Sequence, residues 1–312
     1  MDNFKKKDIL IFGTGEMACI YYRHFSFLGC KPKLVYRNLN SLRTKKALEF
    51  FGDDSIINFE DLNQINPEII LSCTNPESHL ETLKYFSNKE NILCSEKPLS
   101  YSLDEIKEFV RNDLFVLMNR RYYPWVNFVK SKIKNGEVIK AIINIPEVSS
   151  NKYWFNVPQK IINNSVHLFD LCFYLFNGLE NPEYIKNEKL FTSIITSAEH
   201  VPEIIFNIHF GAIENFGIRL YMFDGSIIVC EPLENARVYD SFYIEEPTLE
   251  SNIRKYKPQF KNIFEEDILM PYQKPGILEL CQELITIEPN KLRLPNIKES
   301  LEVMQWIKKI WD

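Results

Sequence analysis

The sequence predicts a two-domain protein, in which an α/β domain with a doubly wound parallel sheet precedes an α+β domain with a large, open, mostly antiparallel sheet. The chain has 312 residues, about twice the length of a common single domain. Up to Met118, short apolar runs alternate with amphipathic helical stretches, whereas longer strand-like segments follow one another after it. We therefore place the domains at 1–118 and 119–312.

The first domain is predicted from alternating strands and helices. Runs such as Ile9-Leu10-Ile11-Phe12 have no polar face, which is typical of strands in a parallel sheet that helices cover on both sides. In chain order, we expect strands at 8–12, 33–36, 56–59, 69–73, 92–95 and 115–118. We expect the helices between them to end near residues 27, 51, 86 and 110.

The second domain is predicted to begin with helical and strand-like stretches and to continue as a meander. We expect helices at 123–134 and 166–176 on either side of a strand at 138–148. Turn signals such as Asp224-Gly225 separate the later strands and favour antiparallel pairing. These strands are expected at 191–197, 203–213, 216–223, 226–231 and 236–244, followed by helices at 276–287 and 297–310.

Composition and charge exclude several classes of protein. Hydrophobic residues make up 45% of the chain, with 23 Phe and 15 Tyr, which is enough for a sizeable core and excludes a disordered chain. The net charge is −5, and without a basic cluster we expect no nucleic-acid partner. There is no apolar run of about 18 residues and no signal-peptide pattern, so we expect a cytoplasmic protein without a membrane partner. The seven scattered cysteines form no CxxC pair, so we expect neither disulfides nor a metal site.

A glycine-rich turn lies between the first predicted strand and the first predicted helix. Residues 13–18 read GTGEMA, a GxGxxA pattern. Gly13 allows the tight turn, Gly15 lets a pyrophosphate approach the backbone, and Ala18 keeps the helix close to the sheet. This context predicts a Rossmann-type dinucleotide-binding domain in which Thr14, Glu16 and Met17 also contact the cofactor.

The end of the second strand bears on the choice between NAD(H) and NADP(H). A carboxylate about 20 residues beyond the glycines would bind the ribose 2′-hydroxyl of NAD. This chain has Tyr36-Arg37-Asn38 there instead. Because a guanidinium suits a 2′-phosphate through charge-assisted hydrogen bonds, Arg37 and Asn38 favour NADP(H) over NAD(H). A solvated surface arginine is the alternative reading of Arg37.

Two further motifs follow strands of the first domain, at the sheet edge where open α/β sheets bind ligands. With the glycine turn and three later segments, they resemble the Gfo/Idh/MocA family, which includes glucose–fructose oxidoreductase and inositol dehydrogenase. The resemblance rests on Gly13-x-Gly15-x-x-Ala18, Thr74-Asn75-Pro76-x-x-His79, Glu96-Lys97-Pro98, 119–124 (NRRYYP), 165–170 (SVHLFD) and Leu294-Pro295.

The resemblance implies an NAD(P)-dependent oxidoreductase that acts on a CH–OH group of a sugar, a sugar nucleotide or a related cyclic polyol or ketone. It implies that Lys97 lies beside nicotinamide and substrate, and that His167 exchanges a proton with the reacting oxygen. Both roles suit hydride transfer, which needs a proton carrier and a positive charge near the developing alkoxide. It also adds Thr74, Asn75, His79, Glu96 and Lys97 to the cofactor-binding residues.

Two positions depart from the family pattern. Asn163 stands where the family usually has an aspartate, and Ser165 replaces a glycine. Asn163 can orient a substrate hydroxyl but cannot take its proton at neutral pH, so we group it with Lys97 and His167 as a catalytic-site residue. Two other functions stay open: reduction of a non-sugar substrate of the dihydrodiol or tetrapyrrole type, and a non-catalytic NADP(H) sensor. The open sheet predicts a homodimer or a homotetramer.

Overall fold

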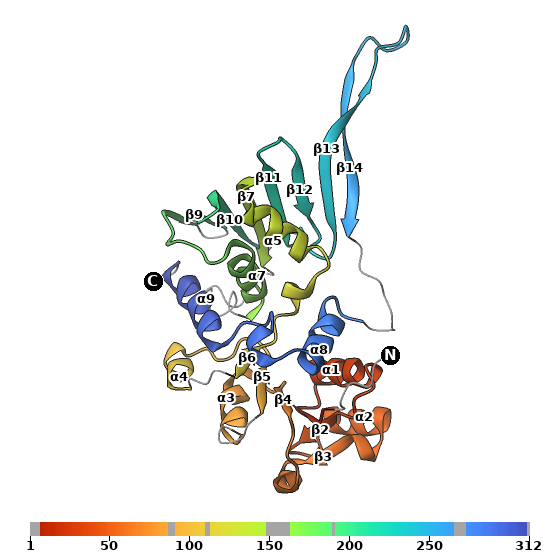
Figure 1. The fold of residues 1–312 in the computed structure, drawn as a ribbon, viewed down its shortest axis with the longest axis vertical. Coiled ribbons are helices and arrows are strands. Elements are labelled where there is room, and N and C mark those ends of the chain that lie inside the picture. The colour runs from red at the N-terminus through yellow and green to blue at the C-terminus, as the bar shows by residue number, and fades with distance from the viewer. Residues whose placement is uncertain are drawn as a thin grey trace. The chain divides into compact units, whose positions relative to one another are not determined.

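The computed structural model describes residues 7–86, 91–109, 113–147, 163–188, 191–264 and 273–310. The chain forms two compact units (Figure 1). The first comprises Met1–Tyr122 with Ile268–Lys309, and the second comprises Tyr123–Asp267 with Ile310–Asp312. None of the helices in the described part of the chain is long and apolar enough to cross a membrane.

The first unit is built on a parallel sheet of six strands in the order β3-β2-β1-β4-β5-β6. Its strands are β1 (Ile9–Phe12), β2 (Lys33–Tyr36), β3 (Ile56–Asn58), β4 (Ile69–Ser72), β5 (Ile92–Ser95) and β6 (Leu114–Val116). Every residue of the three central strands is buried, which confirms that both faces are covered. The strand order reverses between β1 and β4, and such a reversal opens a crevice at the carboxyl ends of the strands.

Helices and short 3₁₀ turns complete the first unit. The α-helices are α1 (Glu16–Phe27), α2 (Leu42–Phe51), α3 (Pro76–Lys84), α4 (Leu103–Glu108), α8 (Ile277–Thr286) and α9 (Ile297–Lys309). The 3₁₀ turns are η1 (Asp53–Ser55), η2 (Phe59–Gln64), η3 (Asn119–Tyr122) and η5 (Pro289–Lys291). The Rossmann-type doubly wound fold expected from the alternating pattern is therefore confirmed.

The two C-terminal helices lie in the first unit, whereas the predicted division of the chain placed them in the second domain. Helix α8 packs on α1, and α9 packs on α4 and β6. Ile277, Leu280 and Leu284 are buried in the same apolar cluster as Tyr21 and Phe25 of α1. The amphipathic pattern of a helix shows that one face is buried, but it does not show which sheet or helix buries it.

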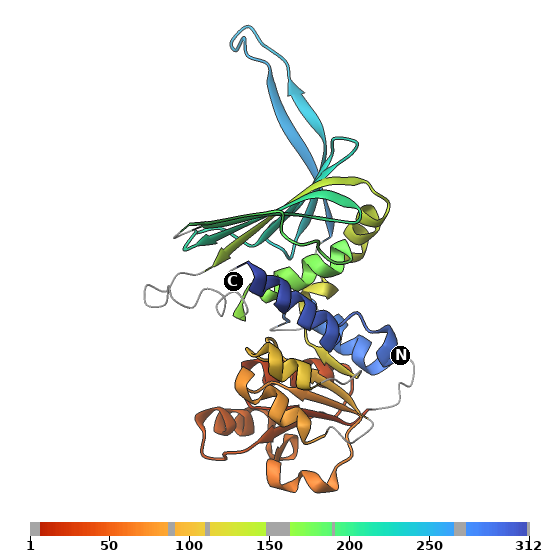
Figure 2. The same ribbon diagram turned by 90° about the vertical axis from the view of Figure 1, so that its left-hand side faces the viewer.

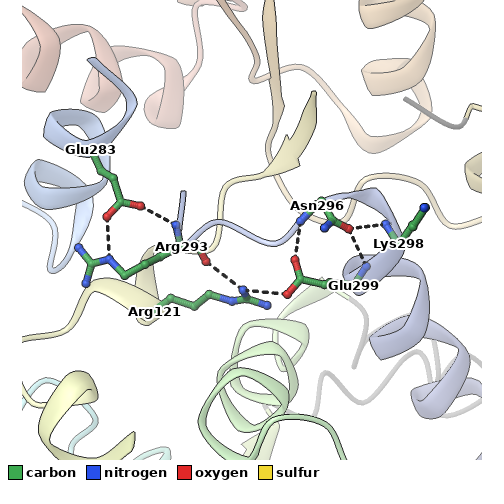
Figure 3. A network of polar contacts seen from close by, with 6 residues as sticks. All are labelled: Arg121, Glu283, Arg293, Asn296, Lys298 and Glu299. Atoms are coloured by element: carbon green, nitrogen blue, oxygen red, sulfur yellow. Dashed lines mark hydrogen bonds and ion pairs between the residues drawn. The ribbon is translucent and has the colours of Figure 1, made fainter. Parts of the chain in front are cut away.

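A buried carboxylate ties the C-terminal segment to η3 (Figure 3). Glu283 accepts hydrogen bonds from the backbone N–H of Arg293 at 2.6 Å and from its Nε at 2.7 Å. The Tyr122 hydroxyl donates to the same carboxylate at 2.8 Å. Arg121 extends the network, because its Nη1 donates to the Arg293 carbonyl at 2.9 Å and lies 3.6 Å from Glu299 Oε1. These bonds connect η3, which follows β6, to the segment 283–299 near the end of the chain.

Replacing Glu283 by glutamine is expected to lower the free energy of unfolding by about 3 kcal/mol, because breaking a buried ion pair leaves its partners uncompensated. Arg293 keeps 28% of its side chain exposed, which places the loss at the lower end for buried pairs. Urea denaturation measures it. Glu288→Gln is the matched control, because the Glu288–Lys291 pair is exposed and should contribute less than about 1 kcal/mol. Equal effects of the two substitutions would contradict the assigned role.

The second unit carries an eight-stranded sheet in the order β14-β13-β12-β11-β7-β10-β9-β8. Its strands are β7 (Val138–Glu147), β8 (Tyr184–Glu188), β9 (Phe191–Ala198), β10 (Val201–Phe210), β11 (Gly217–Met222), β12 (Ile227–Cys230), β13 (Ala236–Glu245) and β14 (Lys255–Phe264). Neighbouring strands pair antiparallel except β7 and β10, so the mostly antiparallel sheet is confirmed. Strands β8 and β14 were not expected from the sequence.

Helices α5 (Val126–Lys134) and α7 (Val166–Phe176) cover one face of this sheet, as Figure 2 shows for α7, which is the green helix. Phe169 of α7 stacks on Phe206 of β10 with ring centroids 5.2 Å apart. Along β9, buried and partly exposed residues alternate, which is the pattern of a strand with one covered face. The opposite face of the sheet, which we call the open face, carries the partly exposed residues.

Candidate active site

A cavity of about 770 Å³ lies at the carboxyl ends of the strands in the first unit. All of the residues predicted from the sequence to bind the cofactor line it: Gly13, Thr14, Gly15, Glu16, Met17, Arg37, Asn38, Thr74, Asn75, His79, Glu96 and Lys97. They come from four separate segments, which follow β1, β2, β4 and β5. The fold therefore gathers at one sheet edge residues that are up to 84 positions apart in the chain.

The glycine turn is shaped by two different requirements. Gly13 has a φ of +111°, and a Cβ there would lie 2.7 Å from the backbone oxygen of Cys73, so this turn excludes any side chain. Gly15 has extended backbone, and a Cβ there would meet nothing closer than Arg43 Nη1 at 3.9 Å. The protein itself therefore leaves room for a side chain at Gly15, which lies on the wall of the cavity. Helix α1 begins directly afterwards with its N-terminus at the cavity and no side-chain cap.

Arg37 lies at the edge of the cavity just beyond β2. Its guanidinium carbon is 4.7 Å from the ring centroid of Phe59, and its Nη1 is 3.8 Å from Glu81 Oε1. The Arg37 side chain is 51% exposed, so the pairing with Glu81 is a weak surface interaction that a phosphate could replace. Asn38 accepts the backbone N–H of Asn40 through Oδ1 at 2.9 Å and so shapes the turn into α2.

Three residues at the start of α2 also line the cavity, and sequence reasoning missed them. Ser41 caps α2 by accepting the backbone N–H of Thr44 at 3.1 Å. The Thr44 hydroxyl lies 3.2 Å from that of Thr14 in the glycine turn. Arg43 brings a second guanidinium to the turn, near Gly15. The signal that could have found them is the serine N-cap directly after Arg37, because it predicts that the first turn of α2 faces the same edge.

A buried pair anchors the segment that carries Lys97. The Tyr21 hydroxyl donates to Glu96 Oε1 at 3.0 Å, and the backbone N–H of Lys97 donates to Glu96 Oε2 at 3.3 Å. Burial raises the pKa of Glu96, and the positive charge of Lys97 opposes that shift in part. Burial and the neighbouring Glu96 raise the pKa of Tyr21, so its hydroxyl stays a donor. Tyr21 was not expected at this motif from the sequence.

His79 holds together the two loops that follow β4 and β5. Its Nδ1 is 2.9 Å from the Pro98 carbonyl oxygen, and its Nε2 is 3.1 Å from that of Thr74. The residue is 1% exposed, and burial lowers the pKa of its imidazole. Although it lines the cavity, both ring nitrogens face backbone carbonyls, so the geometry makes it a positioning residue.

His167 and Asn163 belong to the second unit. Ser165 is the N-cap residue of α7, His167 lies in the first turn of the helix, and Asn163 precedes the helix. His167 and Asn163 are both partly exposed. The buried Glu147, at the end of β7, accepts hydrogen bonds from the Ser165 hydroxyl and from Asn164 Nδ2. Glu147 therefore fixes the segment before α7. A lone glutamate at a strand end gave no signal for this role in the sequence.

No cluster of three or more potential metal ligands occurs among the residues that the structure describes.

Comparison with known proteins gives a distant relative and many structures of one fold. No family model matches the chain. It is 24% identical to the uncharacterized oxidoreductase YrbE of Bacillus subtilis over 290 residues, which are 83% of this chain and 83% of the relative. A dehydrogenase from Chromobacterium violaceum superposes with a TM-score of 0.75 at 14% identity, over 98% of this chain and 94% of its own.

The fold of this chain is that of the Gfo/Idh/MocA oxidoreductases.

Two other solved structures that superpose on this chain differ in their nicotinamide cofactor. An oxidoreductase from Agrobacterium radiobacter in complex with NAD⁺, L-tartaric acid and magnesium has a TM-score of 0.68 at 12% identity, over 97% of this chain and 95% of its own. A putative NADPH-dependent oxidoreductase from Desulfitobacterium hafniense has a TM-score of 0.72 at 11% identity, over 98% and 94%. The fold expected from the resemblance is confirmed, and it does not decide between NAD(H) and NADP(H).

Proposed function

We propose that the chain is an NAD(P)-dependent oxidoreductase that transfers a hydride between the nicotinamide and a sugar, a sugar nucleotide or a related cyclic polyol or ketone. The observation that carries the proposal is the cavity of the first unit, where the glycine turn, Arg37 and Lys97 line one space. The fold and the curated relative are both those of oxidoreductases. The bound nicotinamide would supply or accept the hydride.

The residues of the cavity fit a dinucleotide. The bare backbone at Gly15 and the N-terminus of α1 would bind a pyrophosphate, whose negative charge the helix dipole favours. Arg43 adds a positive charge on the same side. Arg37, stacked on Phe59, would bind the ribose that carries the 2′-phosphate of NADP(H). Lys97 would lie at the nicotinamide end of the cofactor.

Lys97, His167 and Asn163 would carry the polar chemistry. The Lys97 ammonium would stabilise negative charge on the reacting oxygen, and the His167 imidazole would hold or release its proton. Asn163 would donate or accept a hydrogen bond to a substrate hydroxyl. The Glu96–Tyr21 pair would act through Lys97 by fixing the backbone that carries it.

A polyhydroxylated substrate is supported by the residues to which the family resemblance assigns proton transfer. It is also supported by one solved structure with this fold, which is in complex with NAD⁺, L-tartaric acid and magnesium. Absorbance at 340 nm tests the function directly, with inositols, aldoses and nucleotide sugars supplied together with NADP⁺ or NAD⁺. In the reverse direction, keto-sugars and the non-sugar candidates are supplied together with NADPH or NADH. Turnover of at least one of these supports the proposal. Turnover only of dihydrodiols or tetrapyrroles would favour the non-sugar reductase, and tight NADPH binding without any turnover would favour the sensor.

We expect Arg37→Ala to weaken NADPH binding by roughly 10- to 100-fold, because hydrogen bonds to charged groups contribute about 1.5–3 kcal/mol. Binding of NADH, which has no 2′-phosphate, should change less than about twofold. Fluorescence titration measures both. Arg23→Ala is the matched control, since Arg23 lies over the Phe50 ring and does not line the cavity. An equal loss for NADPH and NADH would contradict the selectivity for NADP(H).

We also propose that the chain assembles as a homodimer or a homotetramer through the open face of the large sheet. Ile142, Ile205 and Ile195 stand opposite one another on β7, β10 and β9, and each is partly exposed. A row of isoleucines that crosses three strands on an uncovered face is typical of an interface. Light scattering that detects only a 36.9 kDa species would contradict this assembly.

A further inference from the structure

Strands β13 and β14 form a long hairpin that extends beyond the other strands of the second unit (Figures 1 and 2). We call residues 236–264 the arm. Large apolar side chains are exposed along it, among them Phe242 at 63%, Tyr256 at 59% and Phe260 at 50%. Because an isolated two-stranded hairpin is at best marginally stable in water, an arm with exposed apolar side chains needs a surface to pack on.

The strand register sorts the arm into an apolar face and a charged face. Ile244 stands opposite Tyr256, Phe242 opposite Pro258, and Tyr239 opposite Phe260 across a bulge. Side chains alternate along a strand, so these six residues share one face. The other face is mostly charged or polar: it carries Ser241, Glu245, Lys255, Lys257 and Gln259 together with Tyr243, which is 52% exposed, and Glu245 is bonded to Lys257 at 2.8 Å. Its charges are paired within the arm, whereas nothing in the described part of the unit covers the apolar side chains of the outer half.

The apolar face of the arm continues the open face of the sheet. Tyr239 stands opposite Ile227 of β12, and Tyr221 of β11 stands opposite Ile227 in turn. Ile228, the neighbour that points to the other side, is buried on the covered face. A partner seated on the open face would therefore meet the arm as part of the same surface.

A cavity of about 380 Å³ lies at the base of the arm, and the arm tip carries side chains that could fill such a space. The wall of the cavity has apolar side chains, but charged and polar residues also line it. Its lining residues are Arg219, Asp224, Gly225, Ile227, Val229, Tyr239, Asp240, Ser241, Phe242 and Pro258. At the tip, Leu249 is fully exposed and Ile253 is 68% exposed. A chain that bears both an apolar projection and a recess with apolar side chains in its wall is self-complementary, which is the requirement for a two-fold interface.

The edge of the arm is protected against pairing with another strand. β14 is the last strand of the sheet, and Pro258 in its middle has no N–H to donate. Lys255, Lys257 and Lys261 lie along the same strand, and lysines on an edge discourage strand addition. The arm carries five basic and four acidic residues, a net charge of +1, so it has no strong charge for a nucleic acid or a membrane. These features favour contact through the apolar face with a protein surface.

We propose that the arm grips a second copy of this chain. In a two-fold arrangement the two arms lie antiparallel, apolar face to apolar face, and Leu249 of each tip enters the cavity at the base of the partner's arm. An arm of ten-residue strands is about 34 Å long and roughly 10 Å wide, so its face offers about 340 Å². A stable interface needs about 800 Å² from each partner, so the arm adds to the open face and does not replace it. The inference rests on the proposed self-association and assigns the residues that secure it.

Sedimentation of the full chain and two arm variants tests the proposal. Leu249→Asp and Phe242→Asp should each raise the dimer dissociation constant by at least about tenfold, because each places a charge in the contact. Gln259→Asp is the control: it puts the same charge on the opposite face of the arm and should leave the constant unchanged within about twofold. Both side chains replaced in the test variants are exposed, so the fold of one chain should tolerate the changes.

The outcomes separate this inference from the proposals on which it depends. A monomeric wild type overturns both the self-association and the arm contact. A dimeric wild type whose arm variants associate equally well overturns the arm contact alone. NADPH binding to the same samples tests the oxidoreductase function separately, since the cofactor cavity lies in the first unit. A double variant with Leu249→Cys and Asp224→Cys should form an intermolecular disulfide that neither single variant forms, and its absence in a dimer would overturn the placement of the tip.

Discussion

Replacing Lys97 by methionine is expected to lower kcat by about 100- to 1000-fold, the loss found when one group that stabilises developing negative charge is removed. Lys97 lines the cavity, and its backbone is fixed by Glu96, which Tyr21 holds in turn. Methionine has similar length and no charge, so the substitution removes the ammonium with little change in volume. Stopped-flow and steady-state measurements at 340 nm would give the rate of hydride transfer.

The dissociation constant of NADPH should change far less than the rate, because the glycine turn and Arg37 remain. Lys107→Met is the matched control, since Lys107 is an exposed residue of α4 that pairs with Asp104. An unchanged rate in Lys97→Met would remove Lys97 from the chemistry. A parallel loss of NADPH binding would indicate that the lysine serves binding and not catalysis.

Alanine substitutions at the two glycines of the turn should have different effects. Gly15→Ala is expected to weaken binding of either dinucleotide by more than about tenfold without a loss of stability, because the added Cβ meets only Arg43 in the protein but projects where a pyrophosphate would approach. Gly13→Ala is expected to lower the free energy of unfolding by about 2–4 kcal/mol, because its backbone conformation is strained for alanine and its Cβ would collide with the Cys73 carbonyl.

Gly52→Ala is the control that separates these causes. Gly52 also has a positive φ, +83°, but a Cβ there would meet nothing within 4 Å, so only the conformational cost of about 1 kcal/mol is expected. Thermal unfolding and fluorescence titration of the three variants give stability and binding side by side. If Gly15→Ala binds NADPH as well as the wild type does, no dinucleotide approaches this turn.

The first unit was predictable because local pattern and fold agree there. The expected strands at 33–36 and 92–95 and the expected helix at 42–51 match β2, β5 and α2 residue for residue. The glycine turn and the motifs after β4 and β5 could be placed on one edge, because the carboxyl ends of parallel strands meet there. That edge is where the cavity lies.

The features that the sequence did not reveal depend on contacts between distant segments. Nothing in the pattern of α8 shows that it packs on α1, about 260 residues earlier. β14 escaped notice because Pro258 and three lysines are typical of a loop, and only its pairing with β13 makes it a strand. Tyr21 and Glu147 look like ordinary core and strand-end residues until their partners, Glu96 and Ser165, are seen beside them.

The most direct test of the account is equilibrium binding of NADPH to the purified wild-type chain, followed by the fluorescence of the nicotinamide. The cavity built by the glycine turn, Arg37 and Arg43 predicts saturable binding of one NADPH per chain, at least about tenfold tighter than binding of NADH. Equal binding of the two cofactors would contradict the role of Arg37. If neither cofactor bound, the glycine turn would not be a dinucleotide site, and the proposed oxidoreductase function would fail with it.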